Sequence, residues 1–217
     1  MKNQVTKDAL SIGIAVGIYG VSFGALAVTY GFSILETTLL SSLMFTGASQ
    51  FAFIGVIGAG GGALAAIAVA ALLGSRNTLY ALSLTNVLRA KNFKKLLAAH
   101  LTIDESTGMS VKYRDDETNT KQAFWQTGIS VFVFWNLATI IGAIGASLLD
   151  DPTTYGLDGT IAAAFLALIW PRLNNKTNKL VFITAFLTAI ALTPLLPPGV
   201  PILITATIAV IAGVKNA

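Results

Sequence analysis

A short polar stretch interrupts an apolar run early in the chain and contains the first side chains that could bind a ligand. It reads Thr46-Gly47-Ala48-Ser49-Gln50-Phe51, and no charged residue occurs from Thr37 to Ser75. A helix interrupted at membrane depth exposes backbone N–H and C=O groups, which are tolerated only where protein or a water-filled cavity covers them. Transporters use such breaks to point the N-termini of half-helices at anionic substrate groups.

The candidate binding groups at this break are backbone N–H groups and two polar side chains. A half-helix that starts here would offer the N–H groups of Ala48, Ser49 and Gln50, with Gly47 allowing a close approach. The hydroxyl of Ser49 and the amide of Gln50 add further donors. The alternative is a close-packing notch at Gly47 and Ala48, with Ser49 bonded back to its own helix.

Arg76 and Asn77 form a second polar pair inside the next apolar segment. Arg76 lies well within the length of about 20 residues that a bilayer requires. Arginine is costly there, so it should face a cavity, a partner carboxylate or the membrane interface, unless it extends to the surface from a shallow position. In a cavity Arg76 can contact a carboxylate through two N–H groups, and Asn77 can accept from an ammonium group.

Three protonatable residues follow, His100, Asp104 and Glu105. Carboxylates near a membrane-buried cavity can have raised pKa values, so Asp104, and after it Glu105, are the candidate proton-coupling residues. The alternative places all three on a wet cytoplasmic loop. His100 and Asp104 share a helix face, but two ligands do not make a zinc site. No metal or cofactor is expected, and we find no nucleotide-binding signature.

The composition requires a membrane protein. Of 217 residues 54% are hydrophobic and 11% are charged, with a mean hydropathy of +0.74, whereas about a quarter of the residues of a soluble domain are charged. We therefore predict an all-α, polytopic helical bundle of about seven hydrophobic segments, with at least one broken or re-entrant helix. The net charge of +4 is expected on cytoplasmic loops that face anionic lipid, with no nucleic acid partner.

The chain reads as one integral membrane domain, 1–217, with a basic cytoplasmic connection over 88–121 that holds seven of the fourteen Lys and Arg residues. The apolar segments that we expect are about 9–30, 33–58, 63–87, 122–149, 157–172, 180–196 and 200–215.

The charge pattern conflicts with a simple count of these spans. If Lys2 and Lys7 are cytoplasmic, three full spans cannot precede a cytoplasmic Arg89. Either an early segment is re-entrant, or the N-terminus is outside, or the basic stretch breaks the charge rule. The break at Gly47–Gln50 is compatible with re-entry of the second segment.

The sequence resembles the AzlC family, the large subunit of bacterial branched-chain amino acid exporters. The later Gly156-Leu157-Asp158 and the Pro197-Pro198-Gly199 break fit the same family. The resemblance is carried by four pieces in the family's order: Tyr19-Gly20-Val21-Ser22-Phe23-Gly24-Ala25-Leu26-Ala27, Phe45-Thr46-Gly47-Ala48-Ser49-Gln50-Phe51, Ser75-Arg76-Asn77-Thr78-Leu79-Tyr80-Ala81-Leu82-Ser83 and Thr102-Ile103-Asp104-Glu105-Ser106.

The resemblance implies efflux of leucine, isoleucine and valine, with methionine as a further substrate, by a multi-pass protein of the bacterial or archaeal inner membrane. It also implies a partner, a small AzlD-type membrane subunit. Proton-coupled secondary transport would supply the driving force. The alternatives are an intramembrane enzyme that uses Asp104, Glu105 and His100, although no H-E-x-x-H or G-x-S-x-G motif is present, and a non-transporting scaffold subunit.

Overall fold

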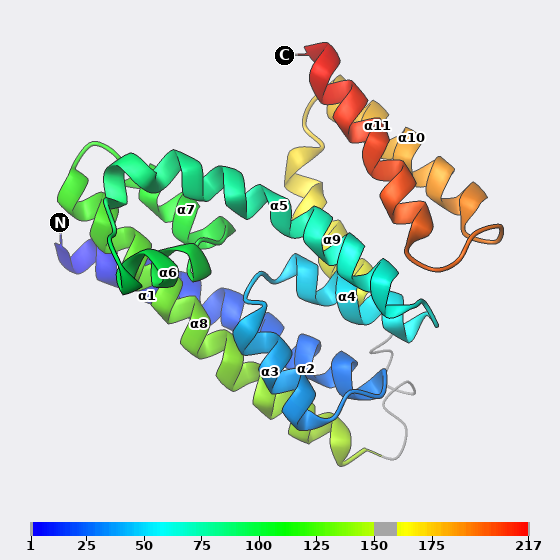
Figure 1. Ribbon diagram of the computed structural model, residues 1–217. Coiled ribbons are helices and arrows are strands. Elements are labelled where there is room, and N and C mark those ends of the chain that lie inside the picture. Colours follow the sequence, from blue (N-terminus) through cyan, green and yellow to red (C-terminus); the bar gives the residue numbers. More distant parts are fainter. Residues whose placement is uncertain (1, 150–159, 217) are drawn as a thin grey trace.

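The computed structural model describes residues 2–149 and 160–216, and within these ranges the protein is all-α with no strand (Figure 1). Among the described residues, three helical stretches are long and apolar enough to cross a membrane: Asn3–Thr29, Ala63–Leu88 and Glu117–Ser147. The predicted membrane helical bundle is confirmed. The helices are α1 (Lys2–Gly17), α2 (Tyr19–Thr29), α3 (Ile34–Leu43), α4 (Ala48–Gly58), α5 (Ala63–Leu88), α6 (Phe93–His100), α7 (Asp104–Lys112), α8 (Glu117–Ser147), α9 (Thr160–Ile169), the 3-10 helix η3 (Trp170–Arg172), α10 (Lys176–Leu192) and α11 (Val200–Asn216).

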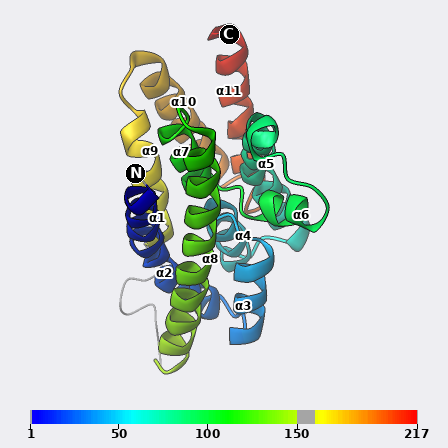
Figure 2. The ribbon, with the colours of Figure 1, turned by 90° about the vertical axis from the view of Figure 1, so that its left-hand side faces the viewer.

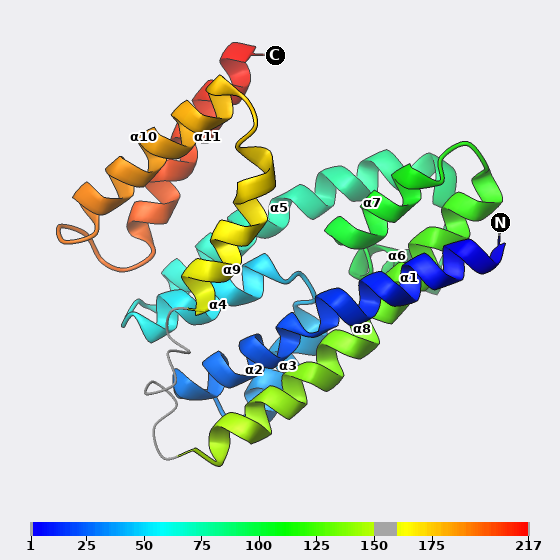
Figure 3. The same ribbon diagram turned by 180° about the vertical axis from the view of Figure 1, so that it is seen from behind.

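Helix α8 lies alongside both α1 and α2 and packs closely against them at glycines (Figures 1 and 3). A Cβ atom on Gly24 would collide with the carbonyl oxygen of Thr139, and one on Gly142 would collide with the carbonyl oxygen of Val21. Small residues allow such close backbone approach, and dispersion contacts then stabilise helix pairs in a membrane. The three helices α1, α2 and α8 therefore form one packed unit, and α3 and α7 also contact α8.

The second apolar segment is broken, as the polar stretch predicts. Ser33 and Glu36 cap the start of α3 through reciprocal hydrogen bonds, and α3 ends at Leu43. A new helix, α4, begins at Ala48, preceded by Gly47 with a φ of +30°. Glycine adopts this left-handed region far more readily than other residues. The predicted interruption therefore depends on Gly47.

The broken segment enters and leaves at the same end of the bundle (Figure 1). Gly58, the last residue of α4, packs against the ring of Tyr30, which directly follows α2. The chain thus leaves α2, runs inward as α3, and returns as α4 to the place where it started. This is the path of a re-entrant segment, and α5 then runs to the opposite end of the molecule (Figure 1).

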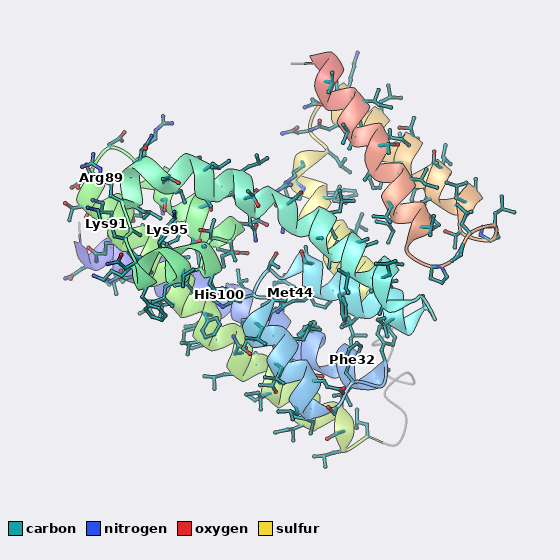
Figure 4. The ribbon with its side chains drawn as sticks, in the orientation of Figure 1. Phe32, Met44, Arg89, Lys91, Lys95 and His100 are labelled. Atoms are coloured by element: carbon teal, nitrogen blue, oxygen red, sulfur yellow. The ribbon has the colours of Figure 1, made fainter. Side chains whose placement is uncertain are left out.

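The opposite end holds the N-terminus and the basic connection. Asp8 in α1 pairs with Lys112 and accepts a hydrogen bond from Tyr113, while Thr6 donates to Gln126 over 3.0 Å. Arg89, Lys91 and Lys95 lie at this end too (Figure 4). Viewed from there, α7 lies between α1 and α5 (Figure 2). With this path of α3 and α4, these basic segments all lie at one end of the molecule, an arrangement compatible with the charge rule.

The last helices stand apart from this body. α10 and α11 form an antiparallel pair, and α11 touches α5 (Figures 1 and 3). No side chain of α10 is buried. The predicted segment 157–172 corresponds to α9 and η3 over 160–172, while Gly156-Leu157-Asp158 lies outside the described residues.

Candidate functional site

A cavity of about 200 Å³ lies where the break before α4, the middle of α5 and the start of α7 meet. One side of it is polar, and the other is formed by aromatic and aliphatic side chains from α1, α2, α4, α8 and α9. Its lining residues are Val16, Tyr19, Phe45, Thr46, Gly47, Ala48, Phe51, Arg76, Asn77, Ile103, Asp104, Glu105, Val131, Trp135 and Phe165.

The structure brings together six of the eight candidate residues that the sequence suggests. These are Gly47, Ala48, Arg76, Asn77, Asp104 and Glu105. They come from the break before α4 and from the helices α4, α5 and α7, and the outermost two, Gly47 and Glu105, are 58 positions apart in the chain. Ser49 and Gln50, the other two, do not line this cavity.

The side chain of Gln50 binds α3 instead. Its Nε2 atom donates to the carbonyl oxygen of Ser41 over 3.0 Å and to that of Leu40 over 3.3 Å. Both carbonyls belong to the last turn of α3. That of Leu40 also accepts from the backbone N–H of Met44 over 3.0 Å, whereas that of Ser41 is one of the terminal carbonyls that the helix itself leaves unpaired. Gln50 is fully buried, so it holds the two half-helices together.

Ser49 bonds within the break and does not line the cavity. Its backbone N–H donates to the carbonyl oxygen of Thr46 over 3.0 Å, and the two hydroxyl groups are 3.4 Å apart. Ser49 lines a second, more open pocket with Gly74 and Thr78 of α5. Thr46 is common to both pockets, so the Thr46–Ser49 turn separates them.

An ion pair crosses the polar side of the cavity. Arg76 Nη2 lies 2.9 Å from Asp104 Oδ2, and the two side chains are only 28% and 27% exposed. This is one of the environments that the sequence allows for an arginine inside an apolar helix. The hydroxyl of Tyr80, one turn further along α5, also interacts with Asp104.

Several buried atoms of this site have no hydrogen-bond partner within the described part of the chain. They are Arg76 Nε, Asn77 Oδ1, Asp104 Oδ1 and Trp135 Nε1. Buried polar groups are normally paired, so unpaired ones around a cavity mark positions that a ligand or water would occupy. Two of the four atoms are acceptors and two are donors.

Local bonding fixes the start of α7, which carries both carboxylates. Ser106 Oγ accepts from the N–H of Ile103 over 3.1 Å and donates to the carbonyl oxygen of Leu101 over 2.6 Å. Acidic side chains in a first helical turn are stabilised by the helix dipole. Glu105 lies outside the three long apolar helices, and its burial, followed by the nearby charge of Asp104, raises the pKa of its carboxyl above the usual 4.5.

Trp135 is a lining residue that the sequence does not single out. Its ring stacks on Phe23 with 6.2 Å between centroids, and it meets Phe51 edge-on at 6.2 Å. The sequence signal that could have identified it is a tryptophan within the uncharged stretch 122–149, because a buried tryptophan N–H usually finds a partner.

His100 does not lie among the cavity residues. It packs against the rings of Phe45 and Phe132, with centroid distances of 5.9 and 5.6 Å, near the middle of the molecule (Figure 4). Among the described residues, no group of three or more His, Asp or Glu side chains could hold a metal ion.

Comparison with known proteins places these elements in a family. The family model described as AzlC protein matches residues 11–149, well over half of the chain and all but one of the cavity residues. No solved structure matches.

Three relatives illustrate the similarity. An uncharacterized membrane protein of Archaeoglobus fulgidus is 32% identical over 157 residues, which cover 71% of this chain and 68% of the relative. An uncharacterized membrane protein of Helicobacter pylori strain 26695 is 25% identical over 178 residues, or 79% and 77% of the two chains. The inner membrane protein YgaZ of Escherichia coli K12 is 30% identical over 145 residues, or 65% and 59%. Because the family model matches residues 11–149 and the chain folds into a bundle of apolar helices, the chain belongs to the AzlC family.

Proposed function

We propose that this membrane protein is the large subunit of an exporter for leucine, isoleucine and valine, with methionine as a further substrate. As a member of the AzlC family it has a transport-related role in a membrane. The substrate class is supported above all by one observation: a cavity at a helix break that combines an Arg–Asp pair with an apolar wall.

The cavity offers complementary chemistry for each part of such an amino acid. Arg76 and the N-terminus of α4 suit a carboxylate. Asp104 and the free Oδ1 of Asn77 suit an ammonium group. Phe51 and Trp135 belong to the apolar wall, on which a branched hydrocarbon side chain can bury its surface.

The proposed transport is driven by protons that Asp104 and Glu105 bind. Both carboxylates line the substrate cavity, so a proton and a substrate can influence one another there. His100 does not line the cavity and packs against the rings of Phe45 and Phe132, which favours a carrier over the alternative of an enzyme that uses all three residues.

The proposed assembly is a complex with a small AzlD-type subunit in the inner membrane, with the end that carries Arg89 in the cytoplasm. That end holds the basic connection, as expected for cytoplasmic loops. Leu64, Leu79 and Leu82 of α5 are 82%, 67% and 67% exposed. Side chains of this kind require lipid or a second subunit around them.

Liposomes loaded with radiolabelled leucine test the proposal. With this chain and the small subunit both present, an acidic outer solution should accelerate leucine release. Asn77→Leu, which fills the cavity, should abolish release. Gly145→Ala in α8, where an added Cβ meets nothing within 4 Å, should leave it unchanged. Release no faster than from protein-free liposomes would refute the proposed function.

A further inference from the structure

The Arg76–Asp104 ion pair makes only one of the two parallel contacts that these groups can form. A guanidinium and a carboxylate can form two parallel hydrogen bonds. Here one contact is made, between Nη2 and Oδ2, while Nε and Oδ1 remain buried and unpaired. The two side chains belong to different helices, α5 and α7, and both line the cavity.

We propose that this ion pair occupies the place of the substrate's own two charges and opens when an amino acid binds. The substrate carboxylate replaces Asp104 on Arg76, and the substrate ammonium replaces Arg76 on Asp104. This inference rests on the proposed function and adds how the site recognises an α-amino acid. No bond other than hydrogen bonds and ion pairs is broken or made.

Both partners of the ion pair are expected to be exchanged together, because an unpaired charge is unfavourable in a partly buried site. Removing one partner of a buried pair leaves the other charge uncompensated, which is strongly unfavourable. A ligand with only a carboxylate would pair with Arg76 and leave Asp104 without its guanidinium. A ligand with both charges compensates both residues at once. The resting ion pair thus selects zwitterions and rejects simple acids and amines.

The surroundings of the pair fit this exchange. Asn77 Oδ1, on the residue after Arg76, is buried without a partner and can accept from the ammonium group. The hydroxyl of Tyr80 interacts with Asp104, and Glu105 is the next residue of α7. The exchange also changes how α5 and α7 are connected, because contacts through the substrate replace the direct ion pair between the two helices.

Three ligands and two variants test the exchange with the full-length chain and its small subunit together in lipid nanodiscs. The ligands are leucine, isocaproate, which lacks the ammonium group, and isopentylamine, which lacks the carboxylate. The wild-type protein should bind leucine on the order of a hundredfold more tightly than either analogue. Asp104→Asn should gain affinity for isocaproate by about tenfold or more, and Arg76→Gln should gain the same for isopentylamine.

Asp8→Asn is the matched control, since it removes an ion pair with Lys112 outside the cavity. Asp8→Asn should leave the order of the affinities for the three ligands unchanged. If the wild-type protein binds leucine and the folded variants gain no affinity for either analogue, the exchange is refuted while the proposed function stands. If the wild-type protein binds no leucine, the proposed function itself fails.

A measurement on the wild-type protein avoids any folding defect of the variants. Methylammonium should strengthen the binding of isocaproate, because it compensates Asp104 when the acid takes Arg76. Potassium at the same concentration controls for ionic strength. Absence of any strengthening by methylammonium, relative to potassium, would overturn the inference.

Discussion

Gln50 in α4 donates a hydrogen bond from Nε2 to the carbonyl oxygen of Ser41 in α3 over 3.0 Å. This contact joins the two halves of the re-entrant segment at buried positions. It also turns the amide of Gln50 away from the cavity that its neighbour Ala48 lines. We therefore assign Gln50 a positioning role in the site.

Gln50→Ala should destabilise the protein by about 1–3 kcal/mol, because it leaves the buried carbonyl oxygen of Ser41 without the donor that Gln50 supplies. The thermal unfolding midpoint in detergent measures this loss, and leucine affinity of the folded fraction should change little. Ser42→Ala is the control, since that hydroxyl bonds only within α3. Normal stability combined with lost leucine binding would return Gln50 to the binding residues.

Gly47→Ala should cost about 1–2 kcal/mol, because an L-residue is strained in a left-handed conformation and Gly47 has a φ of +30°. Space is not the cause, since the nearest atom to an added Cβ would be Trp135 Cη2 at 4.0 Å. Gly108→Ala, in α7 with no atom within 4 Å of the added Cβ, should be neutral or stabilising. Equal effects of the two substitutions in thermal unfolding would contradict this explanation.

Gly142→Ala and Gly145→Ala should differ sharply although both lie in α8. A Cβ at Gly142 would collide with the backbone of Val21, whereas one at Gly145 would meet nothing within 4 Å. Gly142→Ala should therefore reduce the yield of folded protein, and Gly145→Ala should leave it intact. Size-exclusion profiles of the two variants at matched expression make the comparison.

A cysteine at position 77 should report on the cavity, because the chain has no natural cysteine. Asn77→Cys should react with a small water-soluble thiol reagent, and leucine should slow the reaction. Ala66→Cys in the same helix is the control, since Ala66 is fully buried in an apolar cluster and should not react. Reaction of Asn77→Cys only after unfolding would place position 77 in packed protein.

Glu105 should make stability depend on pH. Burial raises the pKa of its carboxyl above 4.5, although Arg76 opposes the effect of Asp104. The folded protein then holds this proton more tightly than the unfolded chain. Its stabilising contribution is complete below pH 4.5 and is lost as the pH rises through the raised pKa. Glu105→Gln should flatten this decline.

Glu36 serves as a control, because its effect on the change of stability with pH should have the opposite sign. Hydrogen bonds from the backbone and side chain of Ser33 lower the pKa of Glu36 below 4.5. Its contribution is therefore present above pH 4.5 and is lost as the pH falls through the lowered pKa. Thermal unfolding of wild type, Glu105→Gln and Glu36→Gln across pH should separate the two effects. A decline toward high pH that persists in Glu105→Gln would assign it to another group.

The sequence alone determined the features that depend on a residue and its near neighbours. The uncharged apolar runs specify membrane helices, because a bilayer excludes charge and unpaired backbone groups. Gly47 allows the turn from which α4 starts at Ala48. The position of Arg76 inside an apolar run predicts that its side chain faces a cavity, a partner carboxylate or the membrane interface.

Only the tertiary structure decided which residues meet. Arg76 pairs with Asp104 because α5 and α7 come together at the N-terminal end of α7. Consecutive helical residues point about 100° apart, so Ala48 and Gln50 face different neighbours, and only the position of α3 gives Gln50 its partners. Re-entry likewise depends on the packing of Gly58 against Tyr30. Each of these contacts joins residues distant in the chain, and local preferences carry no information about them.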